Sequence, residues 1–240
     1  MQDFLIVAHR GGLFNRPENT LAAFDYCLEH QITWVECDIR LSKDEVPVLI
    51  HDDRLEMPHG NMRSVRDMTF KEHSSIDVGG GEHIPTLKMF LERFRDNLRF
   101  VIEFKELDGT RRVIKLIKKL GVEDRVILQS FIPDVLQIAK DTAPEIPRGF
   151  LVDRIAARLA GQRSVINAAA LLKCQYFMPH HLLLNSKLTS AAHDEGLKVL
   201  PWTVNRDEDV ARMLELGVDG IITDRPKHFQ KVIRKQIVDR

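Results

Sequence analysis

The stretch VECDIRLSKDEVPVLIHDD (residues 35–53) places charged side chains in a segment that otherwise has the composition of a buried strand. Glu36, Asp38 and Arg40 occupy alternate positions, so a strand would direct all three toward the same face. Burying charge is costly unless the charges are paired or bind an ion. This face is therefore expected either to carry interior ion pairs or to form a functional site.

A second apolar run, residues 46–50, begins soon after the first run, residues 34–39, and ends just before His51. Two parallel strands need a crossover of roughly a dozen residues or more, which this spacing does not allow. The two runs therefore predict a hairpin that turns near residues 43–45. If that turn is symmetric, His51 lies opposite Asp38.

Apolar runs and helical patterns alternate along the rest of the chain. Val113, Ile114, Ile117 and Leu120, for example, recur at spacings of three or four, as on one face of a helix. The predicted strands are Phe4–Ala8, Trp34–Ile39, Val46–Ile50, Phe100–Phe104, Val126–Gln129, Gly149–Val152, Tyr176–Met178, Val199–Thr203 and Gly220–Thr223. Without the second strand of the hairpin, eight remain. The pattern predicts an α/β fold, a TIM (β/α)8 barrel with a hairpin excursion after its second strand.

The length of 240 residues suits one large domain, so we expect residues 1–240 to form a single TIM-barrel catalytic domain. Residues 53–85 interrupt the alternation with little periodic pattern and a glycine run, Gly79–Gly81. Loops of this length are usually functional or disordered. Because the segment leaves the hairpin at the expected active-site rim, we predict that it forms a small cap insertion.

The composition argues against several classes of partner. Lysine plus arginine equals aspartate plus glutamate, at 35 each, so no strong positive field favours nucleic acid or an anionic membrane. No apolar run approaches the roughly 18 residues of a membrane span, and the N-terminus has no basic leader. We therefore expect neither a stable membrane association nor a signal peptide. Three cysteines without metal-site spacing favour reduced thiols in a cytoplasmic enzyme.

Three carboxylates, those of Glu36, Asp38 and Glu103, are expected to meet at the carboxyl ends of neighbouring strands, where the active sites of TIM barrels lie. Interior ion pairs with Arg10 and Lys105 are one explanation. However, like charges this close repel each other, and two cationic side chains neutralise only part of the charge. Three hard oxygen ligands suit Mg²⁺ or Ca²⁺ better than Zn²⁺. The pattern therefore favours one divalent cation.

Two histidines, His9 and His51, are predicted beside that cation, each just after a strand-like run. Imidazoles titrate near neutral pH and therefore suit general acid and base catalysis. Arg10 and Lys105 would supply fixed positive charge for an anion, and phosphate is the natural candidate. This combination indicates metal-assisted cleavage of a phosphodiester.

Seven short motifs, in order along almost the whole chain, make it resemble the glycerophosphodiester phosphodiesterase family. They are His9-Arg10-Gly11, Pro17-Glu18-Asn19-Thr20, Glu36-x-Asp38, His51-Asp52, Glu103-x-Lys105, Trp202-Thr203-Val204-Asn205 and Thr223-Asp224-x-Pro226. The resemblance implies a metal-dependent TIM barrel that hydrolyses glycerophosphodiesters, which are small-molecule substrates, to glycerol 3-phosphate and an alcohol.

The resemblance also implies roles for individual residues. It assigns Glu36, Asp38 and Glu103 to the metal, and it suggests His9 as the acid and His51 as the base. Arg10 and Lys105 are then phosphate contacts, and Glu18 and Asn19 lie on the rim beside the site. The segment after His51 corresponds to the small cap insertion of the family.

Some of these residues have a simpler explanation. Trp202 lies at the end of a predicted strand and either stacks on the glycerol or fills the mouth of the barrel, and we favour contact with the ligand. Asn19 and Thr20 either belong to the site or cap the helix that follows. Residues 55–59 replace an arginine and threonines that are common in the family at this place, which leaves the choice of alcohol open.

Three other functions fit parts of the pattern. A metal-dependent sugar isomerase on the same fold would need a second metal site or a set of ligands richer in histidine. A phospholipase related to the phosphatidylinositol-specific phospholipases C would share the acid–base site but should bring a hydrophobic rim or a membrane-binding appendage. A non-catalytic barrel that binds phosphate would not need two histidines, because binding alone requires no acid and base.

Overall fold

The computed structural model describes residues 4–12, 16–57 and 60–238. Eight parallel strands form the sheet in the order β10-β9-β8-β7-β6-β2-β1-β11. They are β1 (Leu5–Ala8), β2 (Trp34–Leu41), β6 (Arg99–Phe104), β7 (Val126–Ser130), β8 (Arg148–Val152), β9 (Tyr176–Pro179), β10 (Lys198–Val199) and β11 (Gly220–Thr223). The two outer strands meet through backbone hydrogen bonds, from Asp219 N to Val199 O and from Ile222 N to Pro201 O, each of 2.9 Å. The predicted TIM barrel is therefore confirmed.

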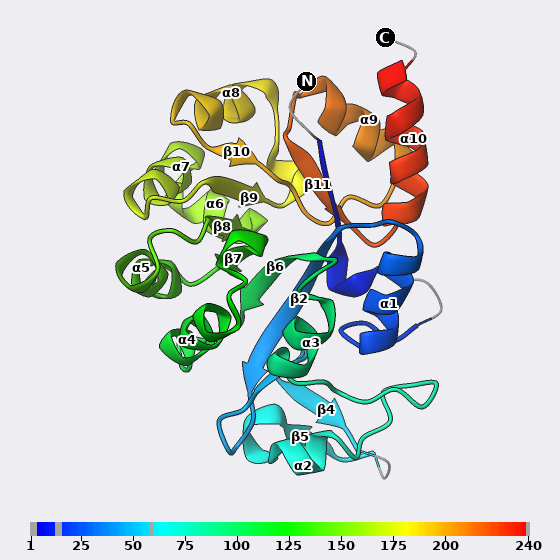
Figure 1. Cartoon of the computed structure of the whole chain (residues 1–240). Coiled ribbons are helices and arrows are strands. Elements are labelled where there is room, and N and C mark those ends of the chain that lie inside the picture. Colours follow the sequence, from blue (N-terminus) through cyan, green and yellow to red (C-terminus); the bar gives the residue numbers. More distant parts are fainter. Residues whose placement is uncertain (1–3, 13–15, 58–59, 239–240) are drawn as a thin grey trace.

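Helices surround the barrel, as Figure 1 shows. The α-helices outside the segment 53–85 are α1 (Leu21–Glu29), α3 (Leu87–Phe94), α4 (Thr110–Leu120), α5 (Pro133–Thr142), α6 (Arg154–Ala160), α7 (Gln162–Leu171), α8 (Ser186–Asp194), α9 (Asp207–Glu215) and α10 (Pro226–Val238). Short 3-10 turns are η1 (His9–Gly11), η3 (Glu123–Arg125) and η4 (His181–Leu183). Among the described residues, none of the helices has the length and apolar character that crossing a bilayer requires.

Alternation along each strand separates two apolar regions. On the outer face, Phe24 of α1 and Phe90 of α3 pack with ring centroids 4.2 Å apart, and Phe90 packs in turn against Phe100 of β6. On the inner face, Val101 and Ile127 belong to a separate buried cluster inside the barrel. This inner cluster fills the barrel below its carboxyl-terminal mouth. The next inward positions along the same strands therefore lie at the mouth of the barrel.

The predicted hairpin is present, but its register differs by one residue from the prediction. β3 (Pro47–Leu49) pairs antiparallel with β2, and Ile50 N donates to Asp38 O at 3.0 Å. Asp38 therefore lies opposite Ile50 and not opposite His51. The reason is the turn: Ser42 N donates to Val46 O, so the loop between them is centred on residue 44 alone.

Residues 53–85 are more ordered than their sequence pattern indicates. They form a two-stranded sheet of β4 (Arg54–Glu56) and β5 (Met62–Ser64), then η2 (Val65–Asp67) and α2 (Phe70–His73). Pro58 and His59 lie outside the described residues. Figure 1 shows this segment beyond the end of β2. Its apolar side chains join those of β3 in a small cluster: Val48, Ile50, Val65 and Ile84, with Leu55, Phe70 and Val78 packed against them.

Candidate active site

A cavity of about 220 Å³ opens at the carboxyl-terminal mouth of the barrel. Its lining brings together most of the predicted site residues: His9, Arg10, Glu36, His51, Glu103, Lys105, Gln129, Phe131, Leu151, Trp202, Thr203 and Ile222. Glu36 and Glu103 occupy inward positions of β2 and β6. The other charged members come just after strands: His9 and Arg10 after β1, Lys105 after β6, and His51 two residues after the end of β3. Strand alternation, which the sequence shows, is therefore what places them in one cavity.

The three predicted carboxylates form one buried cluster. Glu36, Asp38 and Glu103 each offer an oxygen, and these oxygens all lie within 4.8 Å of one another. Asp38 is directly opposite Glu103 in the parallel register of β2 and β6. Lys105 bridges the two, with Nζ 3.0 Å from Asp38 Oδ1 and 2.5 Å from Glu103 Oε1. The cluster therefore contains more negative charge than its one lysine can neutralise.

Burial and mutual repulsion shift the pKa values of these groups in different directions. Burial raises the pKa of Glu36 well above its ordinary value, and the charges of Asp38 and Glu103 raise it further. Burial and Asp38 raise the pKa of Glu103 to about 7. Burial would also raise the pKa of Asp38, but Lys105 and Arg10 lower it below the ordinary value. Asp38 is therefore the carboxylate that stays ionised most firmly.

Arg10 is held in a left-handed backbone conformation, with φ 53° and ψ 30°. This conformation is costly for a residue with a side chain and persists only where the surroundings fix it. Here the Arg10 N–H donates to Glu36 Oε2 at 2.9 Å, and the guanidinium contacts Glu18 Oε1 at 2.9 Å and Asp38 Oδ2 at 3.0 Å. Arg10 thus presents its positive charge at the cavity. Its backbone contacts Glu36 and its guanidinium contacts Asp38, so it holds two members of the carboxylate cluster.

Asn19 has a structural role in the cluster and does not cap α1. Its Nδ2 donates to Asp38 Oδ2 at 3.0 Å, and its Oδ1 accepts the Asp38 backbone N–H at 3.2 Å. Thr20 is the residue that caps α1, because its hydroxyl accepts the N–H of Ala23. Asn19 therefore fixes the position of Asp38.

Each histidine has a carboxylate partner at Nδ1. His51 Nδ1 lies 2.7 Å from Oδ1 of Asp52, the next residue, and His9 Nδ1 lies 2.7 Å from Oδ1 of Asp224. Asp224 was not among the predicted site residues, although the motif Thr223-Asp224-x-Pro226 contains it. A carboxylate at Nδ1 fixes the tautomer and leaves Nε2 as the atom that exchanges a proton with a ligand.

Gln129 is a second residue of the cavity that was not among the predicted site residues. Its Nε2 donates to Glu36 Oε1 at 3.2 Å from the inward position of β7. The alternation of β7 could have indicated this inward position. Trp202 forms a wall of the cavity: its Nε1 donates to Met178 O at 2.8 Å, and its ring packs edge to face against Phe131 at 5.4 Å.

Comparison with known proteins identifies relatives along almost the whole chain. Residues 9–228 match the model of the glycerophosphoryl diester phosphodiesterase family. A glycerophosphodiester phosphodiesterase from Caldanaerobacter subterraneus subsp. tengcongensis is 33% identical, covering 96% of this chain and 98% of its own. A solved glycerophosphodiester phosphodiesterase from Thermotoga maritima covers 97% of this chain and 99% of its own at 26% identity, with a TM-score of 0.82. An Oleispira antarctica phosphodiesterase, solved in complex with the product sn-glycerol-3-phosphate, is 27% identical over 96% of each chain, with a TM-score of 0.85.

Proposed function

Because this chain belongs to the glycerophosphoryl diester phosphodiesterase family, it hydrolyses glycerophosphodiesters to glycerol 3-phosphate and an alcohol, and we propose that the cavity at the mouth of its barrel is the site of that reaction. The observation that carries this proposal is one cavity lined by two histidines and buried carboxylates. A barrel that only bound phosphate would need no pair of histidines with Nδ1 held by carboxylates.

Glu36, Asp38 and Glu103 would hold one divalent cation, Mg²⁺ or Ca²⁺. The donor set fits such an ion, because it consists of three buried carboxylates whose hard oxygens lie within 4.8 Å of one another and carry more negative charge than Lys105 neutralises. Burial, and then repulsion between the carboxylates, raises the pKa values of Glu36 and Glu103, and a bound cation would favour their ionised forms. When bound, the cation would neutralise charge on the non-bridging oxygens of the phosphate.

The protein's own residues then bind the phosphate and move its protons. Arg10 and Lys105 line the cavity with positive charge and would contact the phosphate oxygens. One of His9 and His51 takes a proton from the attacking hydroxyl while the new P–O bond forms. The other gives a proton to the alcohol oxygen while the old P–O bond breaks, which releases the alcohol. Trp202 would flank the glycerol.

The attacking hydroxyl is the 2-hydroxyl of the substrate's own glycerol. Its attack on phosphorus releases the alcohol and forms a five-membered cyclic phosphate. The same histidines, with their roles exchanged, then add water across one P–O bond of the ring to give glycerol 3-phosphate. This route avoids the entropic cost of capturing a water molecule for the first step.

We also propose that residues 1–240 act as one catalytic domain with residues 53–85 as its cap, and that the enzyme works in the cytoplasm. The packing of the segment 53–85 on β3 supports the cap. All three cysteines are buried and free, as expected of a protein in a reducing compartment.

A panel of glycerophosphodiesters tests the proposed function directly. Each is incubated with the enzyme, with and without an exhaustive chelator, and the products are identified by ³¹P NMR. The proposal requires glycerol 3-phosphate and the free alcohol, formed only when Mg²⁺ or Ca²⁺ is present. Release of free glycerol together with the phosphate ester of the alcohol would contradict the proposal, and so would full activity after chelation.

A further inference from the structure

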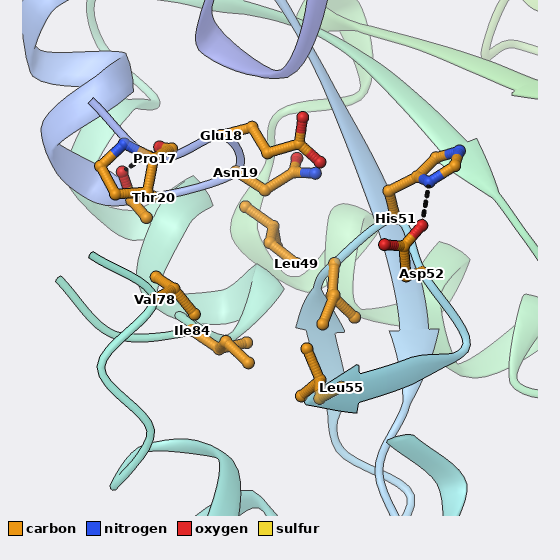
Figure 2. A pocket seen from close by; sticks show the side chains of 11 residues that line it. Pro17, Glu18, Asn19, Thr20, Leu49, His51, Asp52, Leu55, Val78 and Ile84 are labelled. Carbon is orange, nitrogen blue, oxygen red and sulfur yellow. Dashed lines mark hydrogen bonds and ion pairs between the residues drawn. The ribbon is translucent and has the colours of Figure 1, made fainter. Parts of the chain in front are cut away.

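A second cavity, of about 240 Å³, lies beside the first, between residues 17–20 and the segment 53–85. Figure 2 shows the Glu18 carboxylate and the His51 ring along one side of it and Leu55, Val78 and Ile84 along the other. His51 lines both cavities. Glu18 lines the second and binds Arg10 of the first. The two cavities are therefore neighbours that meet at the place proposed for the phosphate.

We infer that this second cavity holds the leaving alcohol, and that it favours a small alcohol with a cationic end. The inference rests on the proposed function. A phosphodiester has two ester arms that leave phosphorus in different directions, so two adjoining cavities can each take one arm. The glycerol arm must keep its 2-hydroxyl near phosphorus. It therefore belongs in the first cavity, beside the polar side chains of Lys105, Gln129 and Thr203. The other arm then extends past His51 into the second cavity.

The lining of the second cavity explains the preferred class of alcohol. Its far side is aliphatic, formed by Leu49, Ile50, Leu55, Val78 and Ile84. None of the described residues that line it is a lysine or an arginine, whereas Glu18 and Asp52 contribute carboxylates. An alcohol with methylene or methyl groups and a positive nitrogen would bury its apolar part and face these carboxylates. An anionic alcohol would find no lysine or arginine among these lining residues and would face the two carboxylates.

This arrangement also assigns the histidines. His51 lines both the first cavity, where the phosphate would lie, and the alcohol pocket, and its Nδ1 lies 2.7 Å from Asp52 Oδ1. As the P–O bond to the alcohol breaks, His51 gives its proton to the alkoxide and becomes neutral. His9 accepts the proton of the 2-hydroxyl as the new P–O bond forms. The roles are thus the reverse of those that the family resemblance suggests, with His51 as the acid of the first step.

Three glycerophosphodiesters that differ only in the alcohol test the inference: the choline ester, the 3,3-dimethylbutanol ester, which replaces the nitrogen of choline by carbon, and the methyl ester. For the wild-type enzyme, we expect kcat/KM for the choline ester to exceed that for its uncharged analogue by up to about fivefold, the range of effect of a solvent-exposed pair of opposite charges. Equal values, or a preference for the uncharged analogue, would overturn the proposed charge preference.

The variant Leu55→Trp would fill part of the pocket from its half-buried rim. We expect it to lower the ratio of kcat/KM for the choline ester to that for the methyl ester by about tenfold or more. Met62→Trp is the matched control, because Met62 lies 48% exposed on the same small sheet, and it should leave that ratio unchanged. An unchanged ratio in Leu55→Trp would refute the alcohol pocket.

A second variant covers the case in which Leu55→Trp does not fold. Leu55→Lys adds a positive charge at the same rim, so the preference for choline over its uncharged analogue should disappear or reverse. An undiminished preference would refute the pocket. If the wild-type enzyme instead hydrolysed none of the three esters to glycerol 3-phosphate, the proposed function would fail, and not the pocket alone.

Discussion

His9 Nδ1 lies 2.7 Å from Asp224 Oδ1, although the two residues are 215 positions apart in the sequence. The pairing of β1 with β11 brings them together, because Ala8 is the register partner of Thr223. Asn205 holds the second oxygen of Asp224 at 2.5 Å. Burial would raise the pKa of Asp224, but the hydrogen bond and charge of His9 lower it below the ordinary value. Asp224 is therefore an ionised residue that positions His9.

Asp224→Asn should lower kcat by roughly 10- to 100-fold with little change in KM, because the amide can no longer hold His9 in one tautomer or stabilise its protonated form. The measurement is steady-state kinetics across pH, where the limb of the profile that reports His9 should move to lower pH. Asp207→Asn is the matched control, since Asp207 pairs with the exposed His228 at 2.8 Å. A pH profile identical to that of the wild-type enzyme would show that Asp224 has only a structural role.

His9→Ala and His51→Ala should each keep the fold and lose roughly 10²- to 10⁴-fold in kcat, the usual contribution of a positioned acid or base. Wild-type kcat/KM should follow a bell-shaped pH profile that reports both groups as a coupled pair. Each variant should lose one limb of this profile. Circular dichroism checks the fold. His193→Ala is the control, because His193 pairs with Asp219 outside the cavity. Near wild-type turnover in either variant would remove that histidine from the mechanism.

Glu36→Gln should weaken metal binding and at the same time raise the melting temperature of the metal-free protein. Substitution removes one of three mutually repelling groups whose charged forms are costly to bury. Saturating Mg²⁺ or Ca²⁺ should raise the melting temperature of the wild-type protein, since ligands that bind only the folded state stabilise it, and should have little effect on the variant. Differential scanning calorimetry with and without the ion measures both effects. The control for loss of charge alone is Glu208→Gln, which replaces an exposed glutamate on α9.

His73 should make the stability of the protein depend on pH. Burial lowers its pKa below the ordinary value, although its Nε2 donates to Val65 O at 3.0 Å. The unfolded chain, with an ordinary histidine pKa of about 6.5, therefore binds this proton more readily than the folded protein. It follows that the free energy of unfolding falls as the pH drops through about 6.5 toward the lower folded value.

His73→Gln should flatten this dependence, because its amide can still donate to Val65 O but cannot take up a proton. Urea midpoints at about pH 7.5 and about pH 5 give the comparison, on either side of an ordinary histidine pKa. His228→Gln, an exposed change on α10, is the control. Equal pH slopes for wild type and His73→Gln would contradict the assignment.

The sequence predicts the barrel and the composition of the cavity because both depend on local periodicity. Period-two alternation correctly turns Glu36, Asp38 and Glu103 inward, and the spacing of apolar runs gives the eight strands. Contacts that depend on distant parts of the chain are harder to predict. A closed barrel places the first strand beside the last, but the pairing of His9 with Asp224 also depends on the register of β1 against β11, which no local pattern encodes.

The hairpin shows where even a local prediction fails. Its turn could be centred on one residue or between two, and the two choices differ by one position in register. The hydrogen bond from Ser42 to Val46 selects the first. The secondary structure within the segment 53–85 was not predicted, for another reason. Its strands have three residues each, too few for an alternating pattern to be recognised, and they become ordered by packing on β3.

A substrate without the glycerol 2-hydroxyl should bind and turn over poorly. In the proposed route this hydroxyl is the nucleophile, held next to phosphorus by the same molecule, and such intramolecular attack can lower a barrier by roughly 7–11 kcal/mol at best. The 2-deoxy analogue of the choline ester retains the phosphate, the alcohol and the 1-hydroxyl, so its loss of rate reports the missing nucleophile. The analogue with the 1-hydroxyl removed is the matched control and should keep most of the rate. With the natural ester, ³¹P NMR at early times should detect the cyclic phosphate before glycerol 3-phosphate accumulates. Hydrolysis of the 2-deoxy ester at close to the normal rate would show that water attacks phosphorus directly.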